Sequence, residues 1–423
     1  MPIVSTVGLV IFEDDALQFT NARVPGVSDP VAFTVSDGVV VSVEPEASRT
    51  RSAVPTFDLG HKLVLPGLVE PHAHLDKAFT ADLVPNPAGD LMGAIDAWKR
   101  SYHERTEDEI FERAVRAVEL AVASGVTAMR THVDVGPAIG RTAVDALVAV
   151  RAELADIIDL QIVALVTNPL PGDAGAPNRR ALLAALEAGA DLVGGCPHLD
   201  DDPQGLIDIA LDAAADAGVG VDLHVDETLD PAMLSLELLA KSVVDRGFDL
   251  PVTASHCVSL SMQPLARQRE VAGLVSGAGI SIVALPQTNL FLQARGQSEA
   301  PPRGITPVGV LRDAGVLVAA GGDNVQDPFN TMGRGDPFET AALLVMAAHV
   351  EPADACEMVS QSGRRLLGHR ASGVEVGAAA DLVAVRASTV REAVAGASSE
   401  RTVIKSGRVV AETELRSTLR PAH

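Results

Sequence analysis

The chain alternates between short apolar runs and longer segments in which apolar residues recur every three or four positions. Eight runs rich in Val, Ile, Leu and Ala follow one another, and polar residues come after each. Near-continuous apolar runs are typical of strands that are buried on both faces, as in a parallel sheet. The runs lie at 63–74 (LVLPGLVEPHAH), 126–135 (VTAMRTHVDV), 160–168 (LQIVALVTN), 190–199 (ADLVGGCPHL), 219–227 (VGVDLHVDE), 251–256 (PVTASH), 280–289 (ISIVALPQTN) and 316–323 (VLVAAGGD).

Helical patterns fill the intervals between these runs. The clearest begins at Thr106, with Glu109 three residues later as in a capping box, and continues with apolar residues at helical spacing up to Gly125. Strands that alternate with helices predict a parallel sheet, and eight such units favour a (β/α)8 TIM-like barrel over an open doubly wound sheet. No Gly-x-Gly-x-x-Gly or phosphate-binding loop occurs, which argues against a nucleotide site. Further helices are expected at 143–154, 180–188, 206–217, 231–245, 265–277 and 308–314.

Both ends of the chain have a different pattern, rich in strands and turns and without long helices. The first 60 or so residues contain VGLVIF and AFTVSDGVVVSVEP, and the region from about 373 to 413 contains GVEVGAAADLVAVRA and RTVIKSGRVVAE. Each end alone is too small to fold well. We therefore expect 1–62 and 370–423 to pair into a small β-sandwich, with the catalytic barrel at 63–369.

The formal net charge of −23 narrows the possible partners. Nucleic acids and anionic membrane surfaces need clustered Lys and Arg, so neither is expected as a partner. The N-terminus lacks the pattern of a signal peptide, and no apolar run is long enough for a membrane span, which predicts a cytoplasmic protein and argues against a periplasmic-type binding protein. Cys196, Cys257 and Cys356 are too few for a disulfide framework and are expected to be reduced thiols.

Histidine and aspartate side chains cluster at the ends of the predicted strands. In an extended strand, side chains two positions apart point to the same face, so His72 and His74 would aim at one point. All runs except the third and the seventh end in a residue that can bind a metal ion, and in a barrel of this type those ends form the active site. The seven residues are His72, His74, His132, His198, His224, His256 and Asp323.

Three imidazoles and one carboxylate with an open position form a hydrolytic metal site, because the ion lowers the pKa of bound water toward ~7. The sequence offers such a set in His72, His74, His224 and Asp323. Glu227, three residues after His224, is the candidate general acid and base, although a solvated loop carboxylate remains the simpler alternative. His256 would face the same centre and stabilise developing charge.

Six motifs, in this order, resemble the amidohydrolase superfamily and its cytosine deaminase-like branch: PGLVEPHAHLDK, RTHVDV, HVDET, TASHC, LPQTNLFLQAR and GGDNVQDPF. The resemblance spans essentially the whole chain. It implies one divalent ion, zinc or iron(II), held by His72, His74, His224 and Asp323. It also implies that Glu227 carries a proton from water to a ring nitrogen, that His256 assists at the attacked carbon, and that Asp323 doubles as a base. The fourth run has no Lys to bridge two metals, which favours a single ion, and Lys77 is expected to form an ion pair.

The chain departs from cytosine deaminases where the substrate would be recognised. The cytosine deaminases that the chain resembles have a Pro-Gln pair at the end of strand three, and an Asp and a Trp after the metal aspartate. This chain has Thr167 and Asn168 at the first place, and Asn324 and Phe329 at the second. Swapping an amide for a hydroxyl changes which substrate atoms can be satisfied. The residues expected to contact the ring are Thr167, Asn168, Asn289, Gln293 and Phe329.

The reaction expected from these residues is hydrolytic attack on a C–N bond of a small ring, most simply deamination of an amino-substituted pyrimidine, triazine or related heterocycle. The expected partners are therefore a small heterocyclic substrate and water. Opening of a cyclic amide, removal of an alkylamine from an ammelide-like triazine, and a non-catalytic barrel are the alternatives. The segment 78–105 contains the only Trp, Trp98, which would either cover the pocket or pack on a short helix. Many such enzymes assemble, so a homo-oligomer is compatible with the sequence.

Overall fold

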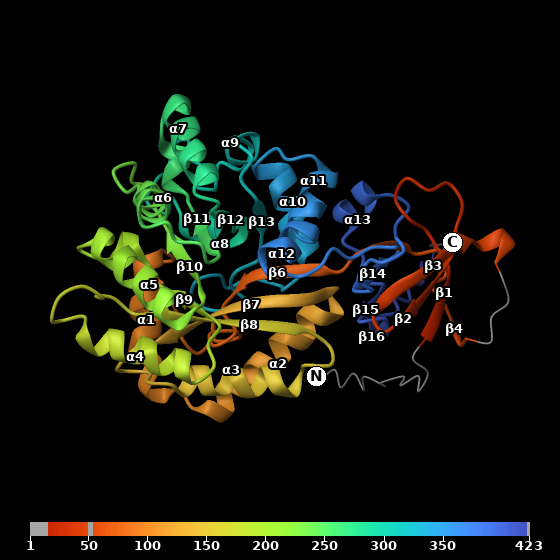
Figure 1. Ribbon diagram of the computed structural model, residues 1–423, viewed down its shortest axis with the longest axis horizontal. Coiled ribbons are helices and arrows are strands. Elements are labelled where there is room, and N and C mark those ends of the chain that lie inside the picture. The colour runs from red at the N-terminus through yellow and green to blue at the C-terminus, as the bar shows by residue number, and fades with distance from the viewer. Residues whose placement is uncertain (1–15, 50–53, 421–423) are drawn as a thin grey trace.

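The protein is built around eight parallel strands that form one sheet, β6 to β13 in sequence order, in the computed structural model, which describes residues 16–49 and 54–420. Helices surround this sheet, and the terminal strands lie to one side (Figure 1). The predicted (β/α)8 architecture is confirmed. The barrel strands are β6 (Leu68–Ala73), β7 (Val126–Val135), β8 (Asp159–Val166), β9 (Leu192–Gly194), β10 (Gly220–Val225), β11 (Val252–His256), β12 (Ser281–Ala284) and β13 (Val318–Ala320).

The barrel closes between β6 and β13 through a short seam. A single parallel bridge joins Ala73 to Asp323, just beyond the end of β13, and the Asp323 amide donates a hydrogen bond to the His72 carbonyl at 3.1 Å. The Glu70 carboxylate reinforces the seam by accepting hydrogen bonds from the backbone amides of His72 and Gly322, at 3.2 and 2.8 Å. The seam therefore brings the first and last strands together where the sequence places two of its candidate ligands.

The outer helices follow the predicted pattern closely. In α2 (Glu107–Ala123) the Thr106 side chain accepts a hydrogen bond from the Glu109 amide, which confirms the predicted N-cap. A short helix around Trp98, as in α1, was one of the two expectations for 78–105, whereas the sequence pattern did not predict α8 or the helices α10 to α13. The other helices are α1 (Leu91–Ser101), α3 (Thr142–Glu153), α4 (Ala176–Glu187), α5 (Pro203–Ala217), α6 (Ser235–Arg246), α7 (Leu265–Gly277), α8 (Pro286–Leu292), α9 (Val308–Asp313), α10 (Pro337–Ala347), α11 (Pro352–Met358), α12 (Gln361–Leu366) and α13 (Val390–Gly396).

Three of the apolar runs do not form single strands. The first divides at Gly67, where any side chain would collide with Thr127, and its first half is β5 (Leu63–Pro66) of a terminal sheet. The seventh ends as a strand at Ala284, because Pro286 starts helix α8, a position that suits its fixed φ. The fourth is a strand only over β9, and a 3-10 turn at Pro197–Leu199 follows it. Consequently Asn289 lies on a helix and His198 lies in a turn.

The terminal segments form two four-stranded sheets, ordered β3-β2-β1-β4 and β16-β15-β14-β5. Phe19 and Phe33 stack at 5.0 Å between ring centroids, in a core that also includes Leu382 and Ile404 of the other sheet. This shared core confirms the predicted pairing of the two ends, although the VGLVIF segment lies outside the described residues. The strands are β1 (Ala16–Ala22), β2 (Val31–Ser36), β3 (Val39–Pro45), β4 (Thr56–Asp58), β14 (Leu382–Val385), β15 (Arg401–Lys405) and β16 (Arg408–Glu412).

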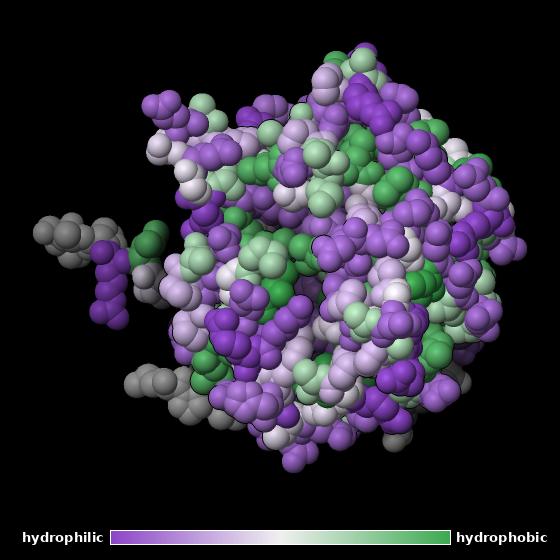
Figure 2. Space-filling view, turned by 90° about the vertical axis from the view of Figure 1, so that its left-hand side faces the viewer, coloured by the Kyte–Doolittle hydropathy of each residue, from purple (hydrophilic) through white to green (hydrophobic). Residues whose placement is uncertain are grey.

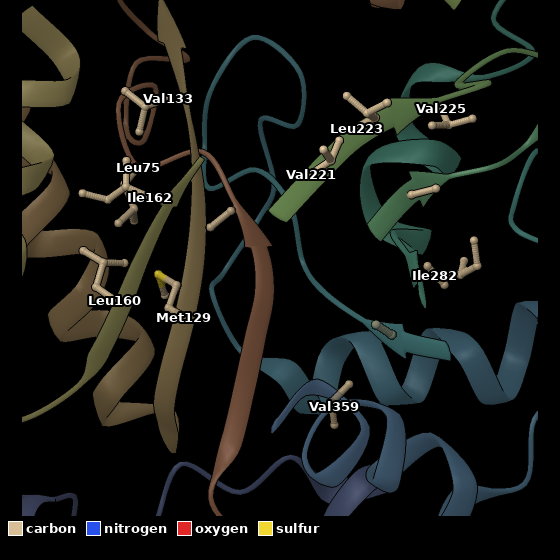
Figure 3. Close-up of a cluster of buried hydrophobic side chains, with 14 of the residues drawn as sticks. Leu75, Met129, Val133, Leu160, Ile162, Val221, Leu223, Val225, Ile282 and Val359 are labelled. Atoms are coloured by element: carbon tan, nitrogen blue, oxygen red, sulfur yellow. The ribbon is translucent and has the colours of Figure 1, made fainter. Parts of the chain in front are cut away.

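Side chains on β10 alternate between an apolar outer face and a polar inner face. On β10, Val221, Leu223 and Val225 belong to the hydrophobic core between strands and helices (Figure 3). Asp222 and His224, between them, point the other way because strand side chains alternate. Within the described part of the chain, no helix is long and apolar enough to span a membrane. On β10, then, the buried polar groups Asp222 and His224 lie on the face opposite the apolar core.

Candidate metal centre and active site

Three histidine nitrogens meet at the C-terminal end of the barrel. The Nε2 atom of His224 lies 3.1 Å from the Nε2 atoms of both His72 and His74. An Asp323 carboxylate oxygen lies 3.6 Å from the nitrogen of His72 and 3.2 Å from that of His74. Ligands about 2.0–2.1 Å from a tetrahedral zinc ion are roughly 3.3 Å apart. The four atoms are thus spaced as ligands around one divalent cation would be.

A chain of hydrogen bonds inside the barrel sets the orientation of His72. The Ser255 hydroxyl donates to an Asp222 carboxylate oxygen at 3.3 Å, so its oxygen is free to accept from His72 Nδ1 at 2.9 Å. Asp222 is held in turn by Arg130, whose guanidinium donates to it at 2.7 Å. His72 therefore carries its proton on Nδ1 and presents the Nε2 lone pair to the cluster, which is the arrangement a metal ligand needs.

The electrostatics of the cluster also fit a cation. Burial, followed by the neighbouring histidines, lowers the pKa values of His72 and His224 well below the usual value, so both rings are neutral near neutral pH. Neither carboxylate oxygen of Asp323 has a hydrogen-bond partner among the described residues. Neutral imidazoles and an unpartnered buried carboxylate are costly without a positive charge between them.

Among the described residues, three sets of side chains bring possible ligand atoms within 4.8 Å of one another, and His72 belongs to all three. The sets with His74 and His224 and with His256 and Asp323 form the cluster above. The third set joins His72 to His132 and Asp222, and the guanidinium on Asp222 makes it a poor cation site. His132 packs against His72 with the rings tilted by 30° and 3.9 Å between ring centroids, and neither of its nitrogens has a hydrogen-bond partner among the described residues.

Glu227 lies beside the cluster and is not a solvated loop residue. Only 5% of it is exposed, and its Oε1 atom has no hydrogen-bond partner in the described part of the chain. Burial, and secondarily the charge of Asp323, raises the pKa of Glu227 well above the usual value. The preceding residue, Asp226, anchors this turn because its carboxylate accepts hydrogen bonds from the Ser235 and Leu236 amides at 2.8 and 3.0 Å.

His256 faces Glu227 from the end of β11. Its Nδ1 atom lies 3.0 Å from the amide nitrogen of Asn289 and 3.6 Å from the Glu227 carboxylate, and its Nε2 atom has no partner among the described residues. Burial lowers the pKa of His256 to about 4, so the ring is neutral. Asn289 is fully buried behind this ring. Asn289 is predicted from the sequence to contact the substrate, whereas the structure places it against His256.

Backbone strain is concentrated at this end of the barrel. Asp226, His256 and Asp323 all adopt positive φ, at 54°, 68° and 66°. Residues other than Gly rarely occupy this region, and such strain collects at functional sites. The three strained residues stand at or just beyond the ends of β10, β11 and β13, the strands that bring His224, His256 and Asp323 to the site.

A cavity of about 670 Å³ opens above the cluster. Figure 2, which views the end of the molecule remote from the terminal sheets, shows a hollow where hydrophobic side chains gather inside a hydrophilic rim. Helix α1 forms the apolar wall of the cavity through Leu91, Ile95 and Trp98. Thr167, Asn168 and Phe329 also line the cavity, as expected from the sequence.

Asp134, at the end of β7, ties helix α1 to the barrel. One of its oxygens accepts hydrogen bonds from the Trp98 indole at 2.9 Å and the Tyr102 hydroxyl at 2.7 Å. The other oxygen accepts from the Lys77 ammonium at 2.8 Å, and Lys77 also pairs with Asp76 at 3.1 Å. Lys77 is thus the ion-pair partner that the sequence predicted. Trp98 combines both expected roles, because it lines the cavity and packs at 2% exposure.

Two other predicted residues lie outside this cavity. Gln293 borders a neighbouring cavity of about 1210 Å³ that shares Glu227 with the first, and its amide donates to the Glu227 carbonyl at 3.3 Å. His198 borders the same outer cavity, with its Nδ1 atom 3.2 Å from the His224 carbonyl, and burial lowers its pKa to about 3. The structure therefore separates these two residues from the metal cluster.

Sequence reasoning missed the groups that support the site, namely Asp134, Tyr102, Ser255 and Asp222. The signal for Asp134 was present: in VTAMRTHVDV, Arg130, His132 and Asp134 alternate and so share one face of the strand. Tyr102 had no comparable signal, because it follows α1 and reaches Asp134 only through the fold.

The chain is similar to known proteins over most of its length. A family model described as the Amidohydrolase family matches residues 106–411. The chain is 34% identical to a pterin deaminase from Rhizobium rhizogenes, over 409 residues that cover 92% of this chain and 93% of the relative. Its structure is similar to that of 5-methylcytosine deaminase from Klebsiella pneumoniae liganded with 5-fluorocytosine, with a TM-score of 0.87 and 30% identity over 96% of this chain and 100% of the other. It is also similar to N-isopropylammelide isopropylaminohydrolase from Burkholderia multivorans, with a TM-score of 0.81 and 28% identity over 94% and 99% of the two chains.

Proposed function

Because the chain belongs to the amidohydrolase family, we propose that it is a metal-dependent aminohydrolase that replaces an amino group of a small N-heterocycle by oxygen from water. The observation that carries the proposal is the convergence of His72, His74, His224 and Asp323 beside a buried Glu227, whose Oε1 atom accepts no hydrogen bond from the described residues. A divalent ion, zinc or iron(II), bound by these four side chains would lower the pKa of water toward ~7 and so supply the nucleophile at neutral pH.

Glu227 is proposed as the proton carrier of this reaction. Its raised pKa means that the carboxyl group can hold a proton near neutral pH, and its Oε1 atom has no competing partner in the described residues. In the proposed reaction a C–O bond forms from water, the C–N bond breaks, and protons taken from the water leave with ammonia. Glu227 takes such a proton and passes it to a ring nitrogen or to the departing nitrogen.

His256 is proposed to stabilise charge at the attacked carbon. If the Asn289 amide donates to Nδ1, the ring proton resides on Nε2, which has no protein partner among the described residues. A neutral imidazole in that state offers an N–H donor to developing negative charge. Neither oxygen of Asp323 accepts a hydrogen bond from the described residues, so one could bind the ion while the other accepts a proton from water.

The proposed substrate class is an amino-substituted pyrimidine or pterin. The pterin deaminase and 5-methylcytosine deaminase to which the chain is similar act on rings in which the amino-bearing carbon is next to ring nitrogen. The two rings differ in size, but both are flat, which suits a cavity with an apolar wall formed by Leu91, Ile95 and Trp98. Removal of an alkylamine from a triazine is the second candidate, supported by the likeness to N-isopropylammelide isopropylaminohydrolase.

The test is turnover by purified protein loaded separately with zinc and with iron(II). Pterin, 5-methylcytosine, cytosine and N-isopropylammelide are supplied in turn, and released ammonia and isopropylamine are measured. Ammonia from pterin or from a cytosine supports the proposal, whereas isopropylamine alone selects the triazine alternative. If the loaded protein releases neither amine from any of the four compounds, the proposed activity is wrong. A chelator-treated sample, inactive until metal is restored, is the matched control.

A further inference from the structure

The cavity wall at the end of β8 differs from what its residue types suggest in the hydrogen-bonding groups that it leaves free for a ligand. Thr167 and Asn168 both line the cavity, and both are half-buried. In isolation, a hydroxyl and an amide can each donate and accept hydrogen bonds. Their neighbours in the fold determine which of these capacities remain for a ligand.

The Asn168 amide group uses both of its N–H hydrogens within the protein. Its Nδ2 atom donates to the Cys196 carbonyl at 3.2 Å and to the Asp200 carboxylate at 3.0 Å. The same Asp200 oxygen accepts from the Leu170 amide, so it acts as an acceptor. Because both partners only accept, the amide cannot be turned round. The Oδ1 atom, an acceptor, is left without a partner among the described residues.

The Thr167 hydroxyl is committed in the same sense. It lies 3.1 Å from Asn178 Oδ1, and the Asn178 Nδ2 atom donates to the Pro169 carbonyl at 2.7 Å. This second bond sets the orientation of the Asn178 amide, so Thr167 must donate its only hydrogen to Asn178. What remains of Thr167 for a ligand is the lone pairs of its oxygen.

The neighbouring strand end offers no free donor either. Both oxygens of Asp134 are occupied by Trp98, Tyr102 and Lys77, and those three donors point to Asp134. We propose that this wall selects heterocycles that turn a ring N–H donor toward it and rejects those that present only ring acceptors there. The inference rests on the proposed function and deepens it, since it concerns which amino-heterocycle the same site accepts.

The size of the expected preference follows from the cost of facing two acceptors without a hydrogen between them. An unpaired buried polar group weakens binding by an amount that corresponds to roughly tenfold to hundredfold. Two pairs of compounds of nearly equal size isolate this effect. Pterin presents an acceptor at N8 where 7,8-dihydropterin has an N–H, and 6-azacytosine adds an acceptor beside N1 where cytosine has a C–H.

The experiment measures kcat/KM for both pairs and, by calorimetry, the affinity of the metal-loaded protein for all four compounds. At least a tenfold preference for the member with fewer remote acceptors is expected in one pair. Comparing wild type with Thr167→Val cancels the intrinsic reactivity of the rings, because the variant keeps the shape and loses the oxygen. The preference is expected to fall toward one in Thr167→Val and to persist in Thr167→Ser, which keeps the oxygen. Thr142→Val, at the start of α3 outside the barrel, is the matched control.

Each outcome has a distinct meaning. Three results overturn the proposal that this wall presents acceptors: kcat/KM ratios near one within both pairs, a preference for the compound with the extra ring acceptor, or a preference that is unchanged in Thr167→Val. Each of them does so even if ammonia is released and the aminohydrolase proposal stands. If no ammonia is released from any heterocycle, the aminohydrolase proposal fails, and the calorimetric affinities still decide the polarity. Absence of measurable binding by all four compounds overturns the polarity as well.

Discussion

Replacing Glu227 by glutamine separates proton transfer from metal binding. Glutamine has nearly the same size as glutamate, and Glu227 makes no side-chain hydrogen bond through Oε1 to any described residue, so the substitution opens no cavity and breaks no such bond. The ligand atoms of His72, His74, His224 and Asp323 are untouched. The variant therefore removes one capacity, that of carrying a proton, from an otherwise intact site.

The expected loss is large and confined to turnover. Positioned proton transfer contributes about 10²–10⁴-fold, which corresponds to roughly 3–5 kcal/mol of activation free energy. Stability should not fall. Burial raises the pKa of Glu227, so the folded state favours the protonated acid, while the unfolded chain ionises near neutral pH. That difference opposes folding as pH rises above the unfolded pKa, and glutamine removes it, so the variant should be at least as stable at pH 7.

Three measurements on the same sample test this reasoning: kcat by ammonia release, metal content by elemental analysis, and the unfolding temperature by calorimetry. The control is Glu270→Gln, since Glu270 has a 62% exposed side chain paired with Arg267 on the outside of the barrel. The control should match the wild type in all three. If Glu227→Gln keeps its metal and more than a tenth of wild-type kcat, Glu227 is not the proton carrier. If the metal is lost together with activity, Glu227 acts on the ion instead.

Three further predictions follow from the contacts. His72→Ala should reduce bound metal from about one equivalent to near zero by elemental analysis, and unchanged occupancy would remove His72 from the ligand set. Asn289→Ala should lower kcat about tenfold at unchanged metal content because the His256 ring loses its only side-chain hydrogen bond within the described residues, and a normal kcat would contradict this. Asp381→Asn removes the buried carboxylate that Arg364 and Lys405 contact at 2.9 and 3.2 Å, leaves Lys405 paired with the partly exposed Asp159, and should cost about 3–5 kcal/mol in urea unfolding at pH 7. Burial raises the pKa of Asp381, but Lys405, the Ser406 amide and Arg364 together lower it below its usual value. The stability deficit of the variant should therefore shrink as pH falls below about 4, and a deficit that is constant with pH would refute the charge argument.

The fold could be predicted because its signals are local. Apolar runs and helical periodicity repeat along the chain, and most predicted elements agree with the structure within a few residues, as for α7 at Leu265–Gly277. The convergence of His72, His74, His224 and Asp323 followed from the same map, because the ends of parallel strands share one rim. The pattern did not predict that β12 ends early, at Ala284. Pro286 starts a helix inside this apolar run, and that helix places Asn289 behind His256.

Supporting groups were harder to predict because their partners are distant in sequence. The Arg130–Asp222–Ser255–His72 chain joins four strands, and each of its members is unremarkable within its own segment. The polar face of the barrel strands could be read from alternation, but the direction of each hydrogen bond could not. That direction matters here, since it determines which nitrogen of His72 carries the proton and hence whether the ring can bind a cation.

The identity of a residue in the wall that contacts the substrate does not by itself show which hydrogen-bonding groups that residue offers to a ligand. Thr167 and Asn168 differ from the Pro-Gln pair of cytosine deaminases, yet both side chains can donate and accept hydrogen bonds. The residue types alone therefore do not determine which substrate is bound. Asn178, ten residues beyond Asn168, and Asp200, farther still, take up their hydrogens. Because a donor consumed by the protein is no longer available to a ligand, specificity at this wall depends on residues that do not touch the substrate. Substitution of Asn178 or Asp200 should therefore change substrate preference, although both residues lie behind the wall and do not line the cavity.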